Sequence, residues 1–253
     1  MKVDISDKRE LHNPHRTDAS IQTLTRYTAY TSAAVAQTDE TVVIDASFLI
    51  SEVIDRADLA QSGYVSQMES ADHMGVMLNE KIESYIYAQH AQFTDFDNAA
   101  IGGSAGNIDI SETNVDEVIT GMLREIHEAK GSSLLERNGA FIVWRPADFE
   151  KLTRFMMANG FSTADNALKN GVKGGIDYMG VTHYQSNLLT AGHLFGGVKK
   201  VAHLGILRAT YGQIVVDEKD PGLVSGVGIT SRIDIKVKAW AKTAPVLFDI
   251  LVA

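Results

Sequence analysis

The stretch 174–189, GGIDYMGVTHYQSNLL, gathers the side chains of this sequence that are most capable of chemistry. His183 stands there beside Tyr184, Ser186 and Asn187. A histidine acts as a general base or activates a nucleophile when an acid or a nucleophile lies within hydrogen-bond reach. No Asp, Glu or nucleophile stands beside His183 at a spacing that catalysis needs. We therefore assign no catalytic role to His183 and interpret the stretch as a strand that ends in a Ser-Asn turn.

Two further groups of residues could bind a metal ion. His12 and His15 have the i, i+3 spacing of two ligands on one helix face, but Pro14 and the polar surroundings disfavour a helix there. Asp95 and Asp97 are two loop aspartates without further ligands in the sequence around them. We expect solvated arm residues in the first case and loop residues in the second, and we predict no metal ligand.

Motifs of nucleotide binding and covalent catalysis are also missing. The segment GGSAGN at 102–107 resembles a phosphate-binding glycine loop, but it lacks the Lys-Ser/Thr pair and does not lead directly into a helix. The sequence has no Gly-x-Ser-x-Gly elbow and no cysteine, so thiolate metal sites, disulfides and cysteine nucleophiles are excluded. We predict no catalytic residue, no cofactor-binding residue and no enzymatic activity.

Charge and composition narrow the function further. The 253 residues carry 23 basic and 32 acidic side chains, a formal net charge of −9. That balance argues against sequence-specific nucleic-acid binding, which depends on neutralising phosphates. The apolar runs are far shorter than the roughly 20 residues that cross a bilayer, so we expect a soluble, intracellular protein without a membrane partner.

The first part of the chain changes character twice. Residues 1–40 are polar and sparse in apolar side chains, which predicts an arm or extended loop. Residues 41–55 are rich in β-branched and apolar side chains, which predicts a strand. From 58 to 92 apolar residues recur every three or four positions, which predicts one long amphipathic helix of about 30 residues acting as a spine.

The middle of the chain alternates helix and strand signals. A capping box at 114–117 predicts a helix that stops at Gly131, and 139–144 reads as a short buried strand. Pro146 fits the first turn of a helix that closes at Gly160. In the strand that follows, the apolar phase shifts near Gly180, which predicts a β-bulge.

The C-terminal part predicts paired strands. Charged and apolar residues alternate over 232–239, so one face of this strand is solvated and the other buried. Residues 245–253, PVLFDILVA, are predicted as its antiparallel partner, with Pro245 at the first strand position. Together these elements indicate an α+β fold.

The order of these segments resembles the major capsid proteins of tailed bacteriophages, the Hong Kong 97-like fold. The resemblance is carried by DETVVIDASFLISEVIDRADLAQSG followed by the long helix, then NGAFIVWRPADFEKL, GIDYMGVTHYQSNLL and AGHLFGGVKKVAHLG, and it runs from about residue 39 to the end. Members of that family usually have a longer segment before the extended loop, so the resemblance implies a shortened or proteolytically matured N-terminus. No residue is assigned to an inter-subunit crosslink.

The resemblance divides the chain into parts. It implies an N-terminal arm and extended loop at 1–45, a peripheral domain with the spine helix at 46–95, an axial domain at 96–210, and the sheet of the peripheral domain at 211–253.

The function implied is that of a structural shell protein. Such a chain assembles with itself through hexamers and pentamers into an icosahedral capsid around double-stranded DNA, and it also meets portal, scaffolding and decoration proteins. The location implied is the virion, with assembly in the host cytoplasm. Deleting residues 1–40 is expected to prevent closed particles and to leave the core folded. Two alternatives stay open: an encapsulin-type nanocompartment shell, and a soluble α/β enzyme that uses His183.

Overall fold

The fold is known from a computed structural model. It describes residues 1–16, 37–55, 66–159, 175–217 and 227–253, with a few single positions between 17 and 36. The predicted helix start near residue 58, the helix end at Gly160 and most positions from 17 to 35 of the predicted arm and extended loop lie outside the described residues.

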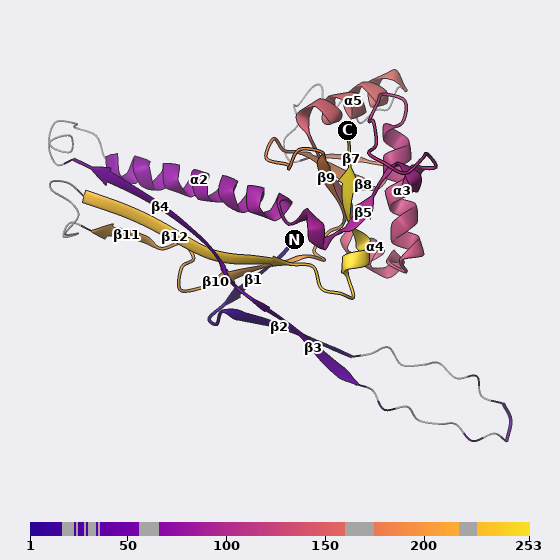
Figure 1. Ribbon diagram of the computed structural model, residues 1–253, viewed down its shortest axis with the longest axis horizontal. Coiled ribbons are helices and arrows are strands. Elements are labelled where there is room, and N and C mark those ends of the chain that lie inside the picture. The colour runs from indigo at the N-terminus through magenta and orange to yellow at the C-terminus, as the bar shows by residue number, and fades with distance from the viewer. Residues whose placement is uncertain are drawn as a thin grey trace.

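A five-stranded sheet forms the long half of the body (Figure 1). Its strands are β1 (Lys2–Ser6), β4 (Ala46–Ile54), β10 (His203–Leu207), β11 (Ile214–Asp217) and β12 (Val227–Lys238). The strand β12 pairs antiparallel with β4, β10 and β11, and β1 adds to β10 in parallel. The strand predicted at 232–239 is thus confirmed as the middle of this sheet.

The helix α2 (Ser66–Tyr87) lies along one face of this sheet (Figure 1). Its 22 residues span about 33 Å at 1.5 Å per residue. The helix ends at Tyr87 and does not continue to residue 92 as predicted, and the short 3-10 helix η1 (His90–Gln92) follows. Leu78 and Ile82 of α2 pack against the sheet residues Ile235 and Val237. The alternation of β12 therefore buries the face that meets the helix, as the sequence pattern predicts. The opposite face is not solvated throughout, because Asp234 is buried. None of the described helices has the length and apolar character to span a membrane.

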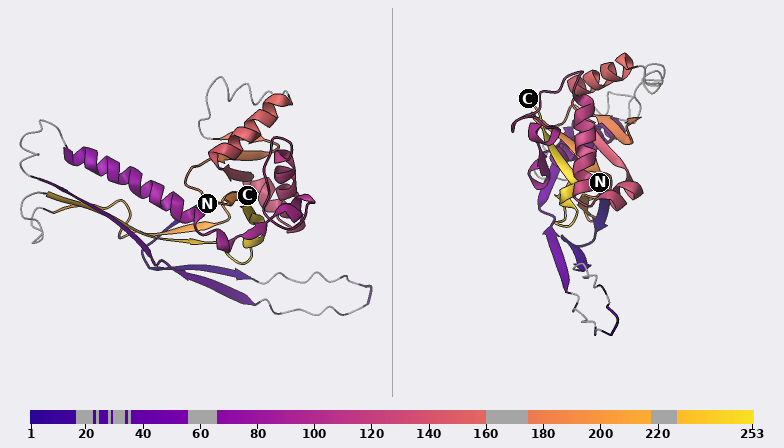
Figure 2. Two further views of the ribbon diagram at one scale, coloured as in Figure 1. Left: turned by 45° about the horizontal axis from the view of Figure 1, so that its top comes forward. Right: turned by 90° about the vertical axis from the view of Figure 1, so that its right-hand side faces the viewer.

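A second sheet of six strands lies near the C-terminal end of α2 (Figure 2). Its order is β5 (Thr94–Phe96), β13 (Leu247–Leu251), β9 (His193–Val198), β6 (Ala140–Trp144), β8 (Val181–Gln185) and β7 (Ile176–Tyr178). The helices around it are α3 (Val115–Glu128), α4 (Ser132–Asn138) and α5 (Pro146–Ala158), with the short 3-10 helices η2 (Asn98–Ile101) and η3 (Ala244–Val246). The strand β6 is buried at every position, and Pro146 occupies the first turn of α5, as predicted.

Three local predictions are wrong. The segment 245–253 does not pair with β12, because β13 is buried at nearly every position and fits between β5 and β9 inside the six-stranded sheet. The N-cap Asn114 of α3 makes no capping bond, because its side-chain oxygen accepts the N–H of Ser111 instead. Near Gly180 the chain makes a turn between β7 and β8 and not a bulge, since Met179 and Gly180 both have positive φ, as the type I′ turn of a two-residue hairpin requires.

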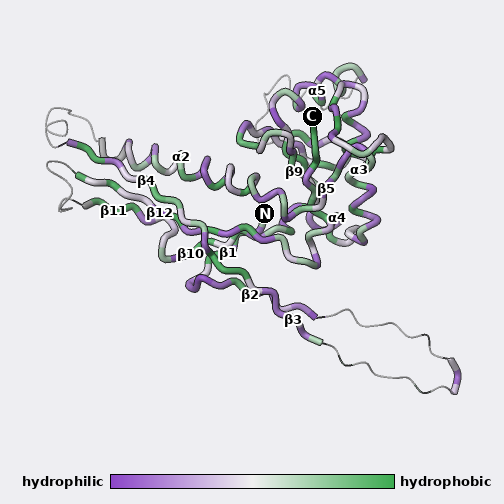
Figure 3. Tube along the Cα trace, in the orientation of Figure 1, coloured by the Kyte–Doolittle hydropathy of each residue, from purple (hydrophilic) through white to green (hydrophobic). Residues whose placement is uncertain are grey.

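A two-stranded ribbon projects from the body (Figures 1 and 2). It consists of β2 (Glu10–Arg16) and β3 (Gln37–Val43), which pair antiparallel. At its base the N–H of Ile44 donates to the carbonyl oxygen of Arg9 at 2.7 Å, so the chain enters and leaves the ribbon at one point. Hydrophobic residues concentrate in the two sheets, whereas most of the ribbon is hydrophilic (Figure 3).

The boundaries 1–45, 46–95, 96–210 and 211–253 stay a prediction of how the domains divide. Both sheets contain strands from more than one of these predicted domains, and β5 (Thr94–Phe96) spans the boundary between residues 95 and 96. The strand β1 belongs to the five-stranded sheet although it precedes the ribbon, and β10 joins the same sheet from within 96–210. The strand β13 joins the six-stranded sheet from within 211–253. Each sheet is therefore assembled from segments far apart in the sequence.

Candidate functional site

His183 is a buried structural residue of β8. Its side chain has no exposed surface, and its Nδ1 accepts the Nε1–H of Trp144 at 2.9 Å. The Nε2–H donates to the backbone carbonyl of Tyr178 at 3.2 Å. Burial lowers the pKa of His183 to about 4, which outweighs the opposing effect of the Tyr178 carbonyl. Both ring nitrogens are used within the fold, so His183 cannot reach a substrate from this position.

The polar residues after His183 connect the six-stranded sheet to the spine helix. The hydroxyl of Ser186 donates to Glu83 of α2 at 2.7 Å, and the hydroxyl of Tyr87 donates to the same carboxylate at 3.0 Å. Burial and then the Glu83 carboxylate raise the pKa of Tyr87. Tyr184 and Asn187 line an open depression of about 530 Å³ next to these residues. The cluster is a junction between α2 and β8.

The ribbon holds the two N-terminal histidines apart. His12 and His15 lie on β2, where an odd spacing places them on opposite faces of the strand. His12 Nδ1 lies 2.8 Å from Asp39 on β3, and His15 Nε2 lies 3.9 Å from Glu40. Each histidine therefore has its own acidic neighbour, and the predicted absence of a helix at this position is confirmed.

The aspartate and glycine motifs near residue 100 form one turn. Asp97 caps η2 by accepting the N–H of Ala99 at 3.1 Å, and its second oxygen accepts the N–H of Gly106 at 3.4 Å. The segment GGSAGN is folded back onto this carboxylate by these bonds. Asp97 thus serves as a loop residue, as the sequence predicts, whereas the same prediction is wrong for Asp95, which lies in the strand β5.

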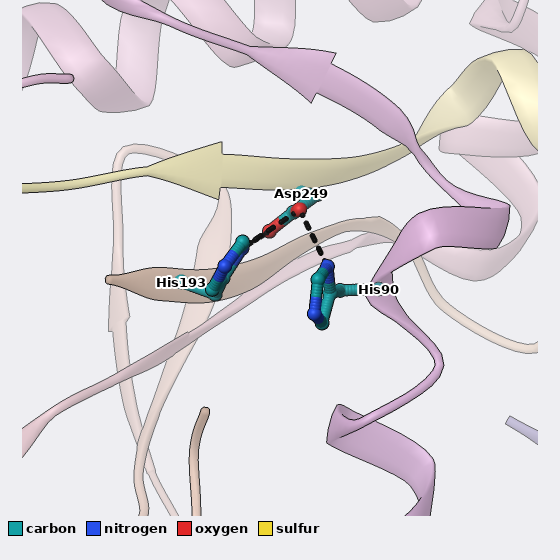
Figure 4. Close-up of side chains that lie close together, drawn as sticks. All are labelled: His90, His193 and Asp249. Atoms are coloured by element: carbon teal, nitrogen blue, oxygen red, sulfur yellow. Dashed lines mark hydrogen bonds and ion pairs between the residues drawn. The ribbon is translucent and has the colours of Figure 1, made fainter. Parts of the chain in front are cut away.

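One polar cluster is not predicted from the sequence. His90 of η1, His193 of β9 and Asp249 of β13 lie within 4.8 Å of one another through their ligand atoms (Figure 4). His90 Nδ1 is 3.1 Å from Asp249 Oδ2, and His193 Nδ1 is 2.9 Å from both oxygens. The three residues are 56 or more positions from one another, so no local spacing could have revealed them.

The five-stranded sheet exposes apolar residues and free edges. Leu49 and Val53 of β4 are 65% and 58% exposed, and the exposed residues Val215 and Val216 lie on β11. Within the described part of the chain, β4 and β11 each pair with β12 alone, which leaves one edge of each strand open. Open edges and clustered apolar side chains are features of protein interfaces.

Comparison with known proteins gives matches in structure alone. No protein-family model and no curated protein matches the sequence. Among solved structures, a chain of Mycobacterium phage Che8 aligns with a TM-score of 0.68 and 15% identity, over 95% of this chain and 84% of that one. The capsid of Ralstonia phage GP4 aligns with a TM-score of 0.67 and 9% identity, over 100% of this chain and 85% of that one.

A virus-like particle from Pyrococcus furiosus aligns with a TM-score of 0.61 and 12% identity, over 98% of this chain and 89% of that one. At these identities the likeness concerns the fold. The two sheets, the spine helix and the projecting ribbon align nearly whole with chains that form shells. The chain therefore has the Hong Kong 97-like fold that the resemblance of its segments implies.

Proposed function

We propose that this chain is the structural subunit of a capsid and assembles with itself, through hexamers and pentamers, into an icosahedral shell around double-stranded DNA. The alignment with the capsid of Ralstonia phage GP4 over 100% of this chain supports the proposal, since it extends through both sheets and the ribbon. A shell protein acts through its contacts with its own copies, which repeat by symmetry.

The ribbon β2–β3 is the observation that carries the proposal. Alternate residues of β2 are exposed, and the ribbon leaves the body on one side (Figure 2). A lone two-stranded hairpin is marginally stable in water, because it buries too little apolar surface. The ribbon is therefore expected to gain its packing from a neighbouring copy of the chain.

The open edges of the five-stranded sheet support the same conclusion. A long exposed edge strand in a monomer invites pairing with another chain. The apolar side chains Leu49 and Val53 stand on β4, directly after the ribbon. Ribbon and edge together offer a second copy one continuous contact region, as a closed shell of identical subunits requires.

Removing the ribbon tests the proposal. Leu11 and Val42 are paired residues near the base of the ribbon. Replacing residues 12–41 with Asn-Gly therefore joins these two residues through a two-residue turn and removes the rest of the ribbon. This replacement keeps β1, which deletion of residues 1–40 would remove from the five-stranded sheet. That earlier deletion is thus expected to damage the core as well, contrary to the expectation from sequence.

Negative-stain electron microscopy and sedimentation of both proteins give the result. The full chain is expected to form closed particles, whereas the shortened chain is expected to stay in small oligomers. Its helical circular dichroism signal should equal that of the full chain, because the replaced segment contains none of the described helices. Closed particles from the shortened chain, or only monomers from the full chain at high concentration, would overturn the proposal.

The content of purified particles distinguishes a capsid from a nanocompartment. The net charge of −9 suits a wall that does not trap a packaged polyanion, so we propose DNA held without sequence-specific contacts. Nuclease-resistant DNA supports a virion, and a packaged enzyme supports an encapsulin-type shell. Portal, scaffolding and decoration proteins and assembly in the host cytoplasm are part of the same proposal. The alternative of a soluble enzyme that uses His183 is disfavoured, because this side chain is fully buried.

A further inference from the structure

The buried carboxylates of the described chain differ in their counter-charges. Asp148 is 1% exposed and pairs with Arg145 at 2.6 Å and with Lys151 at 3.2 Å. Asp234 is 2% exposed and pairs with Arg232 at 2.9 Å. Arginine and lysine carry permanent positive charges near neutral pH, so both carboxylates have a constant counter-ion. A buried charge without such a partner is strongly unfavourable.

Asp249 is the exception to this pattern. It is 2% exposed, and the ion pairs that the described residues make with it come from His90 and His193. Neither imidazole carries a permanent positive charge. The described ion pairs therefore give Asp249 no permanent counter-charge of the kind that Asp148 and Asp234 have.

The geometry of the cluster suits a metal ion. Both Nδ1 atoms point at the Asp249 carboxylate, and the two rings stack with centroids 3.8 Å apart (Figure 4). The nitrogen–oxygen distances are 2.9 to 3.1 Å. In a tetrahedral zinc site with bonds of roughly 2.0–2.1 Å, ligand atoms lie about 3.3 Å apart. The nitrogen–oxygen distances would therefore have to lengthen by only a few tenths of an ångström to admit the ion.

We propose that His90, His193 and Asp249 bind one divalent transition-metal cation of the zinc class, through the two Nδ1 atoms and a carboxylate oxygen. Two imidazoles and one carboxylate are a donor set that suits Zn²⁺ and Co²⁺ and is poor for Mg²⁺ or Ca²⁺, which take oxygen ligands. Three protein ligands leave the fourth position to water or to a donor from another molecule.

The location gives the ion a structural role. His90 lies in η1, directly after the spine helix, while His193 and Asp249 stand on the neighbouring strands β9 and β13 of the six-stranded sheet. A metal bound here fixes the end of α2 to that sheet. Binding energy that is available only in the folded state adds to stability.

Titration of the metal-free protein with ZnCl₂ tests the proposal. Isothermal titration calorimetry is expected to give one tight site per chain, and Co²⁺ is expected to give the visible absorption of a tetrahedral complex. His90→Gln, His193→Gln and Asp249→Asn are expected to weaken binding by roughly 10–100-fold or more, the range found for loss of outer ligand partners alone. His73→Gln and His12→Gln, at histidines outside the cluster, are expected to leave the affinity unchanged.

His90 is the most exposed member of the cluster, with a side chain 30% exposed, so its substitution is the one least harmful to folding. Circular dichroism of each variant verifies that the chain is folded. Equal zinc affinity of the original protein and His90→Gln would overturn the proposal, and so would a loss of affinity in His12→Gln of the same size. Tighter binding of Mg²⁺ than of Zn²⁺ would also overturn it.

Discussion

Replacing His183 with glutamine separates the charge of the buried imidazole from its hydrogen bonds. A glutamine side chain can accept the Nε1–H of Trp144 through its oxygen and donate to the Tyr178 carbonyl through its nitrogen, the two bonds that His183 makes. It does not titrate. The variant should therefore lose the pH dependence that His183 contributes to stability while retaining most of the local structure.

The size of this effect follows from the pKa of about 4 in the folded chain against 6.5 for an ordinary histidine. Between these pH values the unfolded chain takes up a proton that the folded chain does not. The free energy of unfolding therefore falls as the pH falls. The loss from this residue, relative to pH 8, is about 2 kcal/mol at pH 5 and about 3 kcal/mol at pH 4.

Urea denaturation of the unassembled chain, followed by tryptophan fluorescence, measures this difference at several pH values. The stability advantage of the original chain over His183→Gln should shrink by about 2 kcal/mol between pH 8 and pH 5. His73→Gln, at an exposed histidine of α2, is the matched control for loss of one imidazole. A difference that stays constant over this pH range would refute the assignment of His183 as a buried neutral residue.

Two further substitutions probe packing and the helix junction. Gly197→Ala should lower the free energy of unfolding by about 2–4 kcal/mol, because Gly197 has a φ of +135° and an added Cβ would collide with the Val246 carbonyl oxygen. Gly75→Ala in α2 should raise the free energy of unfolding by about 1 kcal/mol, because an added Cβ there meets open space. A similar effect of both changes in chemical denaturation would contradict this reasoning. Ser186→Ala should cost about 1–2 kcal/mol by removing the hydroxyl that Glu83 accepts, and a neutral result in the same assay would show that this bond does not hold α2 to β8.

Elements with strong local signals could be predicted from the sequence. The strand β6, the start of α5 at Pro146 and the alternating strand β12 all appear where the pattern places them. The strand β12 is predicted from its period of 2, β6 from a short continuous apolar run, and the start of α5 from a proline. Each of these signals lies within a few neighbouring residues.

Pairing between distant segments could not be predicted in this way. The apolar run at 245–253 fits a strand beside β12 as well as a strand inside another sheet, and only the competition for partners decides between them. The strand β1 could not be predicted for the same reason. Its five residues resemble the rest of a polar arm in sequence, and they form a strand because they pair with the distant strand β10. The cluster of His90, His193 and Asp249 depends on the pairing of β9 with β13 and on the contact of η1 with β13.

The connection between ribbon and body has a mechanical consequence. The strand β3 continues into β4 with only Ile44 and Asp45 between them, and β4 is hydrogen-bonded to β12 along its whole length. A force that pulls on the ribbon would act on the hydrogen bonds between β4 and β12 in shear. These bonds would then bear the force together and would not break one after another. Tension applied at the far end of the ribbon is thus carried into β12, the longest of the described strands.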